Sequence, residues 1–297
     1  MRMLALALLL ADPREATVSA WERVVDLTES RISRELSSNS SFLATDFLSR
    51  AEKDRVSRSF EAGEVFTTKL PVEVEIPGGM VHHWLGAVLV PDIEVEDLLR
   101  WLQEYDEHDD RFDEVEDSRL LSRDGDTFEV FLRLRRKKVV TVHYATEHEV
   151  VYRSHGPGRY SSVSRATRIS ELEDAGTPDE REKSPGSDRG FLWRLHSYWR
   201  FQQVPEGVVI ECESLSLSRG VPAAVRWLVV PYLNSVPRES LESTLLPIRE
   251  RGGSAKKDLR TSLELPLEEA IPADRVGERQ PVGDDRTEVV LLLHDER

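Results

Sequence analysis

The chain has 297 residues, of which 39% are hydrophobic and 32% charged, and its formal net charge is −15. A chain of this length can bury a sizeable core without disulfides or metal ions. Its acidic balance argues against a dominant nucleic-acid role, because phosphate binding requires a positive surface. The single cysteine, Cys212, excludes an intramolecular disulfide and any cysteine-based zinc site. An ordinary transmembrane helix is also excluded, since no run of ~18 or more apolar residues occurs.

The N-terminal segment 1–11 has the order of a secretory signal, with Arg2 followed by an apolar stretch from Met3 to Ala11. No clean small-x-small cleavage site closes it, so the alternatives are a frayed apolar N-terminus or a misassigned start codon. The segment predicts an exported protein, and a cytoplasmic one where those alternatives apply. Residues 12–62 form a predicted helical extension, because apolar residues recur at helical spacing up to about residue 36.

Short strands are predicted from Gly63 onwards, where the apolar period changes from helical towards two. A longer strand over 80–90 passes into an amphipathic helix that starts after Pro91 and Asp92. Two further runs flank the turn 123–126, and an Asp-Gly turn between such runs is a strong hairpin signal. The β pattern continues through three more runs, which indicates an antiparallel meander: 139–144, 147–153 and 159–172.

A polar segment interrupts the meander at 174–189, and its content of Asp, Glu, Pro, Gly and Ser predicts a mobile loop. Residues 190–201 then alternate, so that large apolar side chains gather on one face. A last strand over 208–217 precedes an amphipathic helix over 221–251, which its prolines are expected to divide. Residues 252–297 are predicted to form a polar, flexible tail.

The order of these elements resembles the START-like helix-grip superfamily (SRPBCC), which includes polyketide cyclase/dehydrase-type and lipid-transport domains. The likeness covers about residues 64–250 and is carried by packing and turn segments, not by catalytic motifs. These segments are Ser122–Phe128 with Phe131–Leu134, Ser197–Phe201, Gly207–Glu213, Leu217–Arg219 and Pro237–Leu241. The resemblance implies an α+β fold over 63–251, in which a curved antiparallel sheet of about six to seven strands grips a long C-terminal helix, with an extra N-terminal helix outside it.

The resemblance also implies an apolar cavity between the sheet and the C-terminal helix, and aromatic-lined cavities are what ligand sites usually look like. Strand alternation places bulky apolar side chains on the face that would line it. The predicted ligand-binding residues are Phe128, Val130, Leu132, Trp193, Leu195, Trp199, Phe201, Ile210, Trp227 and Leu241. The alternative is that the same side chains fill a solid core.

A basic cluster stands out in this acidic chain at the end of the predicted hairpin. It consists of Arg133 and of the predicted membrane-contact residues Arg135, Arg136, Lys137 and Lys138. The simplest interpretation is a solvated strand end. The functional alternative is transient contact with anionic lipid headgroups, where each such charge contributes about 1 kcal/mol.

Candidates for acid/base chemistry are few. His82 and His83 are adjacent in a strand, so one of them points inward, where a hydrogen-bonded structural histidine is the usual outcome. His148 stands alone in its strand. Glu211 and Glu213 share one strand face and favour a charge ladder with arginines of neighbouring strands, typically on the convex side. Nucleophile elbows, phosphate-cradling loops and dinucleotide fingerprints are absent, and no metal site, cofactor or catalytic residue is predicted.

The sequence thus favours a non-enzymatic protein that binds or transfers a hydrophobic small molecule, lipid-like or polyketide-like, with no nucleic-acid partner. One alternative is a cyclase/dehydratase-type enzyme on a polyketide-like substrate, which would need an inward-facing acid/base pair. The other is a cavity-free structural or interaction module.

Overall fold

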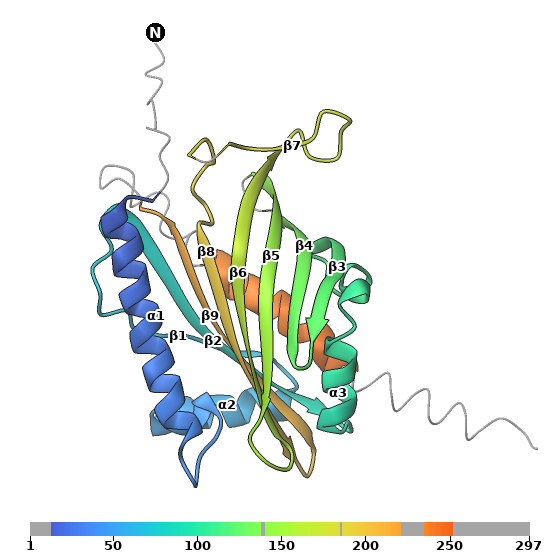
Figure 1. Cartoon of the computed structure of the whole chain (residues 1–297). Coiled ribbons are helices and arrows are strands. Elements are labelled where there is room, and N and C mark those ends of the chain that lie inside the picture. The colour runs from blue at the N-terminus through green and yellow to red at the C-terminus, as the bar shows by residue number, and fades with distance from the viewer. Residues whose placement is uncertain (1–12, 138–139, 185, 221–234, 252–297) are drawn as a thin grey trace, which may run out of the picture.

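The structure, a computed structural model, describes residues 13–137, 140–184, 186–220 and 235–251. In this part of the chain, nine antiparallel strands form one sheet, and helices lie on both of its faces (Figure 1). The strands are β1 (Phe66–Lys69), β2 (Gly79–Pro91), β3 (Val115–Asp124), β4 (Thr127–Lys137), β5 (Thr141–Ser154), β6 (Arg159–Glu173), β7 (Arg181–Glu182), β8 (Arg194–Val204) and β9 (Gly207–Arg219). The helices are α1 (Glu15–Leu36), η1 (Ala44–Phe47), α2 (Arg50–Ala62), α3 (Val95–Leu102), η2 (Tyr105–Glu107), α4 (His108–Arg111) and a C-terminal helix over 235–251.

The sheet follows the order β1-β2-β9-β8-β6-β5-β4-β3, and β7 pairs with β6 outside that path. The β3–β4 hairpin is confirmed, because Asp124 pairs with Thr127 around Gly125. The φ of Gly125 is 57°, a left-handed conformation that glycine adopts without strain. The architecture is the α+β helix grip that the sequence resemblance implies. Of the short strands predicted from Gly63 onwards, only β1 forms before β2. The predicted runs 139–144 and 147–153 form one strand, β5, and β7 lies within the predicted loop 174–189.

One turn of the C-terminal helix contacts both ends of the curved sheet. Leu241 lies against Gly86 of β2, where an added β-carbon would be only 2.7 Å from the leucine side chain. The adjacent Ser240 donates a hydrogen bond to Glu114, immediately before β3 (3.2 Å). Because β2 and β3 lie far apart in the strand order, the sheet must curl around the helix to meet both residues (Figure 1).

The concave face of the sheet and this helix enclose the main apolar core. Leu245 and Ile248 of the helix are fully buried there, together with side chains of α3 and of five strands. Burying a leucine or isoleucine side chain stabilises a fold by about 1.5–3 kcal/mol. The helix is therefore held mainly by its apolar stripe.

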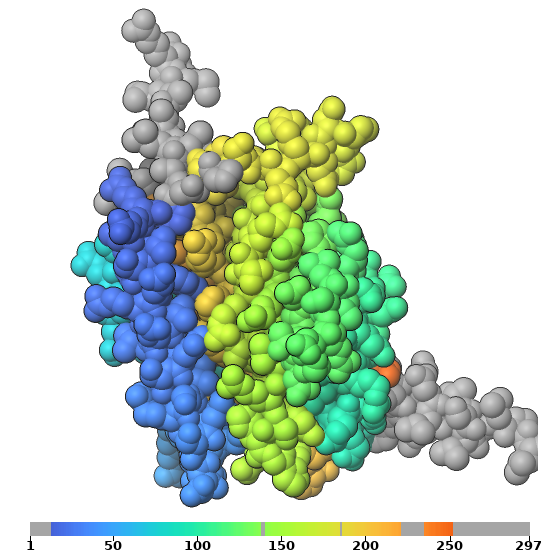
Figure 2. All heavy atoms as spheres, viewed as in Figure 1, coloured from blue at the N-terminus to red at the C-terminus, as the bar shows by residue number. Residues whose placement is uncertain are grey.

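The convex face is covered by α1 along β8 and β9. Trp21, Val24 and Ile32 of α1 pack against Leu215 and Leu217 of β9. Figure 2 shows that α1 covers only one side of this face, and that β4, β5 and β6 remain at the surface. The two faces of β8 and β9 are thus both buried, one beneath each terminal helix.

Charged side chains are buried beneath α1. Arg200 of β8 donates to Glu35 of α1 (2.5 Å) and to the carbonyl oxygen of Phe42 (2.9 Å). Glu211 of β9 accepts hydrogen bonds from the first two backbone N–H groups of η1 (2.5 and 2.9 Å), and burial raises the pKa of Glu211. These groups attach the N-terminal segment to the sheet.

Glu213 of β9 forms a second buried polar group on the same face. It makes an ion pair with Arg31 of α1, and a hydrogen bond of 2.6 Å joins it to Nε2 of His83. His83 is therefore a hydrogen-bonded structural histidine on the convex side, and both Glu211 and Glu213 lie on the face opposite the cavity.

Gly86→Ala is expected to destabilise the protein by about 1–3 kcal/mol, because the new methyl group overpacks the contact with Leu241 and Leu245. Urea unfolding measures this change. The double variant Gly86→Ala/Leu241→Ala should lose less than the sum of the two single changes, since the shorter side chain makes room. Unchanged stability of Gly86→Ala would contradict the close approach of the helix to β2.

Arg200→Gln is expected to cost about 1.5–3 kcal/mol, because the buried Glu35 carboxylate loses one of its two cationic partners and keeps only Arg31 (2.8 Å). The matched control is Arg100→Gln in α3, where the ion pair with Asp97 is exposed and is expected to contribute less than about 1 kcal/mol. Similar losses in the two variants, compared by urea unfolding, would show that the convex-face pair is not buried.

Candidate functional site

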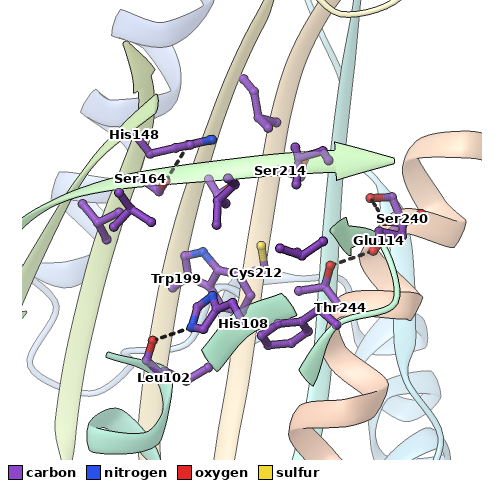
Figure 3. A pocket seen from close by; sticks show the side chains of 18 of the residues that line it. Leu102, His108, Glu114, His148, Ser164, Trp199, Cys212, Ser214, Ser240 and Thr244 are labelled. Carbon is purple, nitrogen blue, oxygen red and sulfur yellow. Dashed lines mark hydrogen bonds between the residues drawn. The ribbon is translucent and has the colours of Figure 1, made fainter. Parts of the chain in front are cut away.

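A cavity of about 210 Å³ lies between the concave face of the sheet and the C-terminal helix. Strands β4, β5, β6, β8 and β9 form its floor, and helix residues 240–244 form its roof. Residues of α3, η2 and α4 close one end. In Figure 3, His148 and Ser164 lie on one side of the cavity, and Glu114, Ser240 and Thr244 lie on the other.

Most of the predicted ligand-binding residues line this cavity: Val130, Leu132, Leu195, Trp199, Phe201 and Leu241. Phe128 and Ile210 belong to the same apolar core but do not line the cavity; the exposed fractions of these residues are 1% and 0%. Trp227 lies outside the described residues. The apolar face that alternation predicts is therefore the face that encloses the cavity.

Trp193 lies on the other face of the sheet, which corrects the expectation that it shares a face with Trp199. It packs beneath α1 in one cluster with Trp21, and its indole N–H donates to Asp188 (3.3 Å). The physical reason is that β8 begins only at Arg194. Strand alternation therefore does not extend to Trp193.

A row of serine side chains crosses the floor of the cavity. Ser164 of β6 pairs with Ser197 of β8, and Ser197 pairs with Ser214 of β9, so the three side chains lie next to one another on one face. Alternation alone places Ser197 on the apolar face, but it carries no information on which residues pair across strands. The feature of the sequence that could have indicated this row is Ser197 itself, a small polar residue between Leu195 and Trp199 on the apolar face.

His148 of β5 is a buried imidazole beside this row. Its ring nitrogens contact the hydroxyls of Ser164 (3.3 Å) and Thr146 (3.0 Å), and Figure 3 shows the first of these contacts. Burial, and to a smaller extent the nearby His196, lowers the pKa of His148 to about 4. The ring is therefore neutral at pH 7 and offers a hydrogen-bonding group without a charge.

The closed end of the cavity holds two tyrosines and a second neutral histidine. The hydroxyls of Tyr105 and Tyr152 share a hydrogen bond (3.0 Å), and burial raises the pKa of Tyr152 to about 12. Nε2 of His108 donates to the Leu102 carbonyl (2.9 Å), and burial lowers the pKa of His108 to about 4. All of these side chains are uncharged at pH 7.

An ion pair lies at the mouth of the cavity. Arg136 of β4 pairs with Glu114, which also accepts the hydrogen bond from Ser240. Burial lowers the pKa of Arg136 to about 10, so its guanidinium stays charged at pH 7. Alternation along β4 turns Arg136 towards the cavity, away from Arg135. Membrane contact by Arg136 stays a prediction.

The other predicted membrane-contact residues do not line the cavity. Arg135 is exposed and pairs with Glu116 (3.6 Å), and Lys137 is exposed. Lys138 lies outside the described residues. Membrane contact by Arg135 and Lys137 stays a prediction.

In the described ranges, no group of three or more His, Cys, Asp or Glu side chains is arranged to hold a metal ion. Over the same ranges, none of the helices combines the length and the apolar character that crossing a membrane requires.

Solved structures that resemble this chain include a STAR-related lipid transfer protein, a STARD protein and an aromatase/cyclase. The Zhui aromatase/cyclase from Streptomyces sp. R1128 has a TM-score of 0.43 at 12% identity, over 62% of this chain and 98% of its own. Human STARD10 has a TM-score of 0.40 at 12% identity, over 76% of this chain and 88% of its own. The STAR-related lipid transfer protein from Xanthomonas axonopodis has a TM-score of 0.38 at 16% identity, over 60% of this chain and 98% of its own.

No protein-family model matches the sequence, and no curated protein matches it. The identities to the solved structures are too low to carry a function over to this chain. The site is therefore interpreted from its own residues.

The cavity is better suited to binding uncharged groups than to moving protons. General acid–base catalysis works best when the catalytic pKa lies near the working pH. The pKa values of His148, about 4, and of Tyr152, about 12, are both far from neutrality. Within the described part of the chain, the cavity therefore offers apolar contact and neutral hydrogen bonds, beside the ion pair of Arg136 and Glu114.

His148→Gln is expected to remove a pH-dependent part of the stability. The folded-state pKa of about 4 lies below the ordinary value of 6.5. The unfolded chain therefore binds this proton more readily, and stability is lost as the pH falls from about 6.5 towards 4. Between pH 7 and pH 5, urea unfolding should show the wild type losing about 2 kcal/mol more than the variant. Equal losses would contradict a neutral, buried His148.

Proposed function

We propose that the protein binds a compact hydrophobic small molecule in the cavity beneath the C-terminal helix. The observation that carries this proposal is a cavity of about 210 Å³ that extends into the main apolar core. Protein cores are otherwise close-packed, and empty space in them costs stability, at roughly 24 cal/mol per Å³. A ligand that fills the space offsets that cost.

The volume sets the size of the ligand. An apolar protein cavity of about 150 Å³ binds benzene, whereas ordinary small-molecule sites range from ~300 to 1,000 Å³. The volume of this cavity lies between those values. It suits a molecule of one or two rings, and a two-chain lipid would require the C-terminal helix to move outward.

The aromatic wall favours a flat ligand. Trp199 and Phe201 lie parallel, with an interplanar angle of 5° and ring centroids 6.2 Å apart. Aromatic rings attract one another in offset-stacked arrangements, by about 0.5–1.5 kcal/mol beyond their area burial. A ring-shaped ligand on this wall would gain the same contact.

The two other functions considered from the sequence are less well supported. A cyclase/dehydratase-type enzyme would need an acid/base pair with pKa values nearer neutrality than those of His148 and Tyr152. A structural module with a solid core would not need an enclosed cavity.

Two further expectations remain proposals of the same kind. Export rests on the segment 1–11, which lies outside the described residues. Contact with an anionic membrane surface is proposed for Arg135, Arg136, Lys137 and Lys138, of which Lys138 lies outside the described residues.

Naphthalene is a direct probe of the proposed function. Titration followed by tryptophan fluorescence should show one molecule bound per chain. Ser197→Phe, which places a ring inside the cavity, should weaken binding by at least about tenfold, or 1.4 kcal/mol. The control Ser122→Phe makes the same change at an exposed position of β3 and should bind as the wild type does.

Native mass spectrometry of the protein from its own host, followed by organic extraction, tests the proposal without a chosen probe. A compact apolar molecule is expected in the extract. An empty extract together with no uptake of naphthalene by the wild type would refute the proposed function.

A further inference from the structure

Three serine hydroxyls lie at regular intervals on the cavity floor. Ser164, Ser197 and Ser214 are direct cross-strand partners on β6, β8 and β9, and all three line the cavity. Neighbouring strands are ~4.8 Å apart. The row therefore presents hydroxyl groups at about that interval, along a line perpendicular to the strands.

The hydrogen-bonding capacity of this row is largely unused. The hydroxyls of Ser197 and Ser214 have no hydrogen-bond partner among the residues that the structure describes. In the roof, by contrast, the hydroxyls of Ser243 and Thr244 both donate to the carbonyl of Ser240 (2.9 Å each). Ser197 and Ser214 are half-buried and line the cavity, so their hydroxyls are available to a polar group of a ligand.

The surroundings of the row are neutral. His148 contacts Ser164 (3.3 Å) and is uncharged at pH 7. The charges of Arg136 and Glu114 at the mouth compensate each other. Burying a charged group without a partner costs far more than burying a hydrogen-bonded neutral one. The ligand atoms that meet the row are therefore uncharged oxygens, as in a hydroxyl or a carbonyl group.

Apolar side chains flank the row along β8. Leu195 and Trp199 lie two residues to either side of Ser197, on the same face. A ligand oxygen that is displaced along the strand from the serines would meet these apolar groups and lose its hydrogen bond. The floor therefore restricts both the chemistry and the spacing of the polar atoms that it accepts.

We propose that Ser164, Ser197 and Ser214 recognise a flat, uncharged ring compound that carries two oxygen substituents in a 1,3 arrangement. Such oxygens lie about one strand spacing apart, ~4.8 Å, so each can meet one of two neighbouring serines. Oxygens in a 1,2 arrangement lie too close together to do so. This inference rests on the proposed function and names the ligand class and the residues that select it.

Isothermal titration calorimetry with three probes tests the inference: naphthalene, naphthalene-2,3-diol and naphthalene-1,3-diol. The wild type should bind the 1,3-diol about fivefold to tenfold more tightly than the 2,3-diol, which is the effect of one additional net hydrogen bond. In Ser197→Ala and in Ser214→Ala, this preference should fall below about twofold. In each variant the affinities for the two diols are compared with the affinity of the same variant for naphthalene, which has no oxygen to meet a serine.

Ser216→Ala is the matched control. Ser216 lies two residues beyond Ser214 in β9, on the same face of the strand but outside the cavity lining. The variant should keep the preference for the 1,3-diol.

The outcomes separate this inference from the proposed function. If the wild type bound the two diols with equal affinity and still bound naphthalene, the proposed role of the serine row would be wrong, and the proposed small-molecule binding would stand. A preference that survives in both Ser197→Ala and Ser214→Ala would also overturn the role of the serine row. Failure of all three probes to bind the wild type would overturn the proposed function itself.

Discussion

The fold depends on the contact of one helical turn with both ends of the sheet. Leu241 lies against Gly86 of β2, and Ser240 bonds Glu114 before β3. An α-helix is ~10 Å wide, and a row of eight strands at ~4.8 Å spacing is much wider. The sheet therefore reaches the helix at both ends only by curling. Strands in the middle of the curl stay away from the helix, and the cavity is the space that this geometry leaves.

The two faces of the sheet bury polar groups in different ways. Beneath α1, charged groups such as Arg200 and Glu211 are buried with partners that compensate them. On the concave face, the same two strands contribute Ser197 and Ser214 instead. Strand alternation separates the two sets, so the charges that attach α1 do not reach the cavity. A neutral, largely apolar molecule can therefore enter this cavity at a low cost in free energy, because the cavity holds no unpaired charge.

Local patterns in the sequence were sufficient for the elements and for the apolar face. Turn chemistry located the β3–β4 hairpin at Gly125, and period-two alternation placed Val130, Leu132 and Trp199 together. These features depend on neighbours within a few residues, so a single strand carries the information for them. The same argument fails at Trp193, because it precedes the first residue of β8 and alternation holds only within a strand.

By itself, then, the sequence determined the approximate positions of most strands and the apolar face of those that line the cavity, and the family resemblance implied the covering helix. The tertiary structure alone decided which residues meet across strands. The pairing of β5 with β6 carries a bulge, where β6 has the extra residue Thr167 opposite the step from Glu147 to His148, and such a bulge shifts every later side chain to the other face. The serine row follows from register. Alternation alone turns Arg136 inward, but only the tertiary structure supplies Glu114, the residue that compensates its charge. Cross-strand register is set by hydrogen-bond pairing between segments far apart in the chain, which no local pattern encodes.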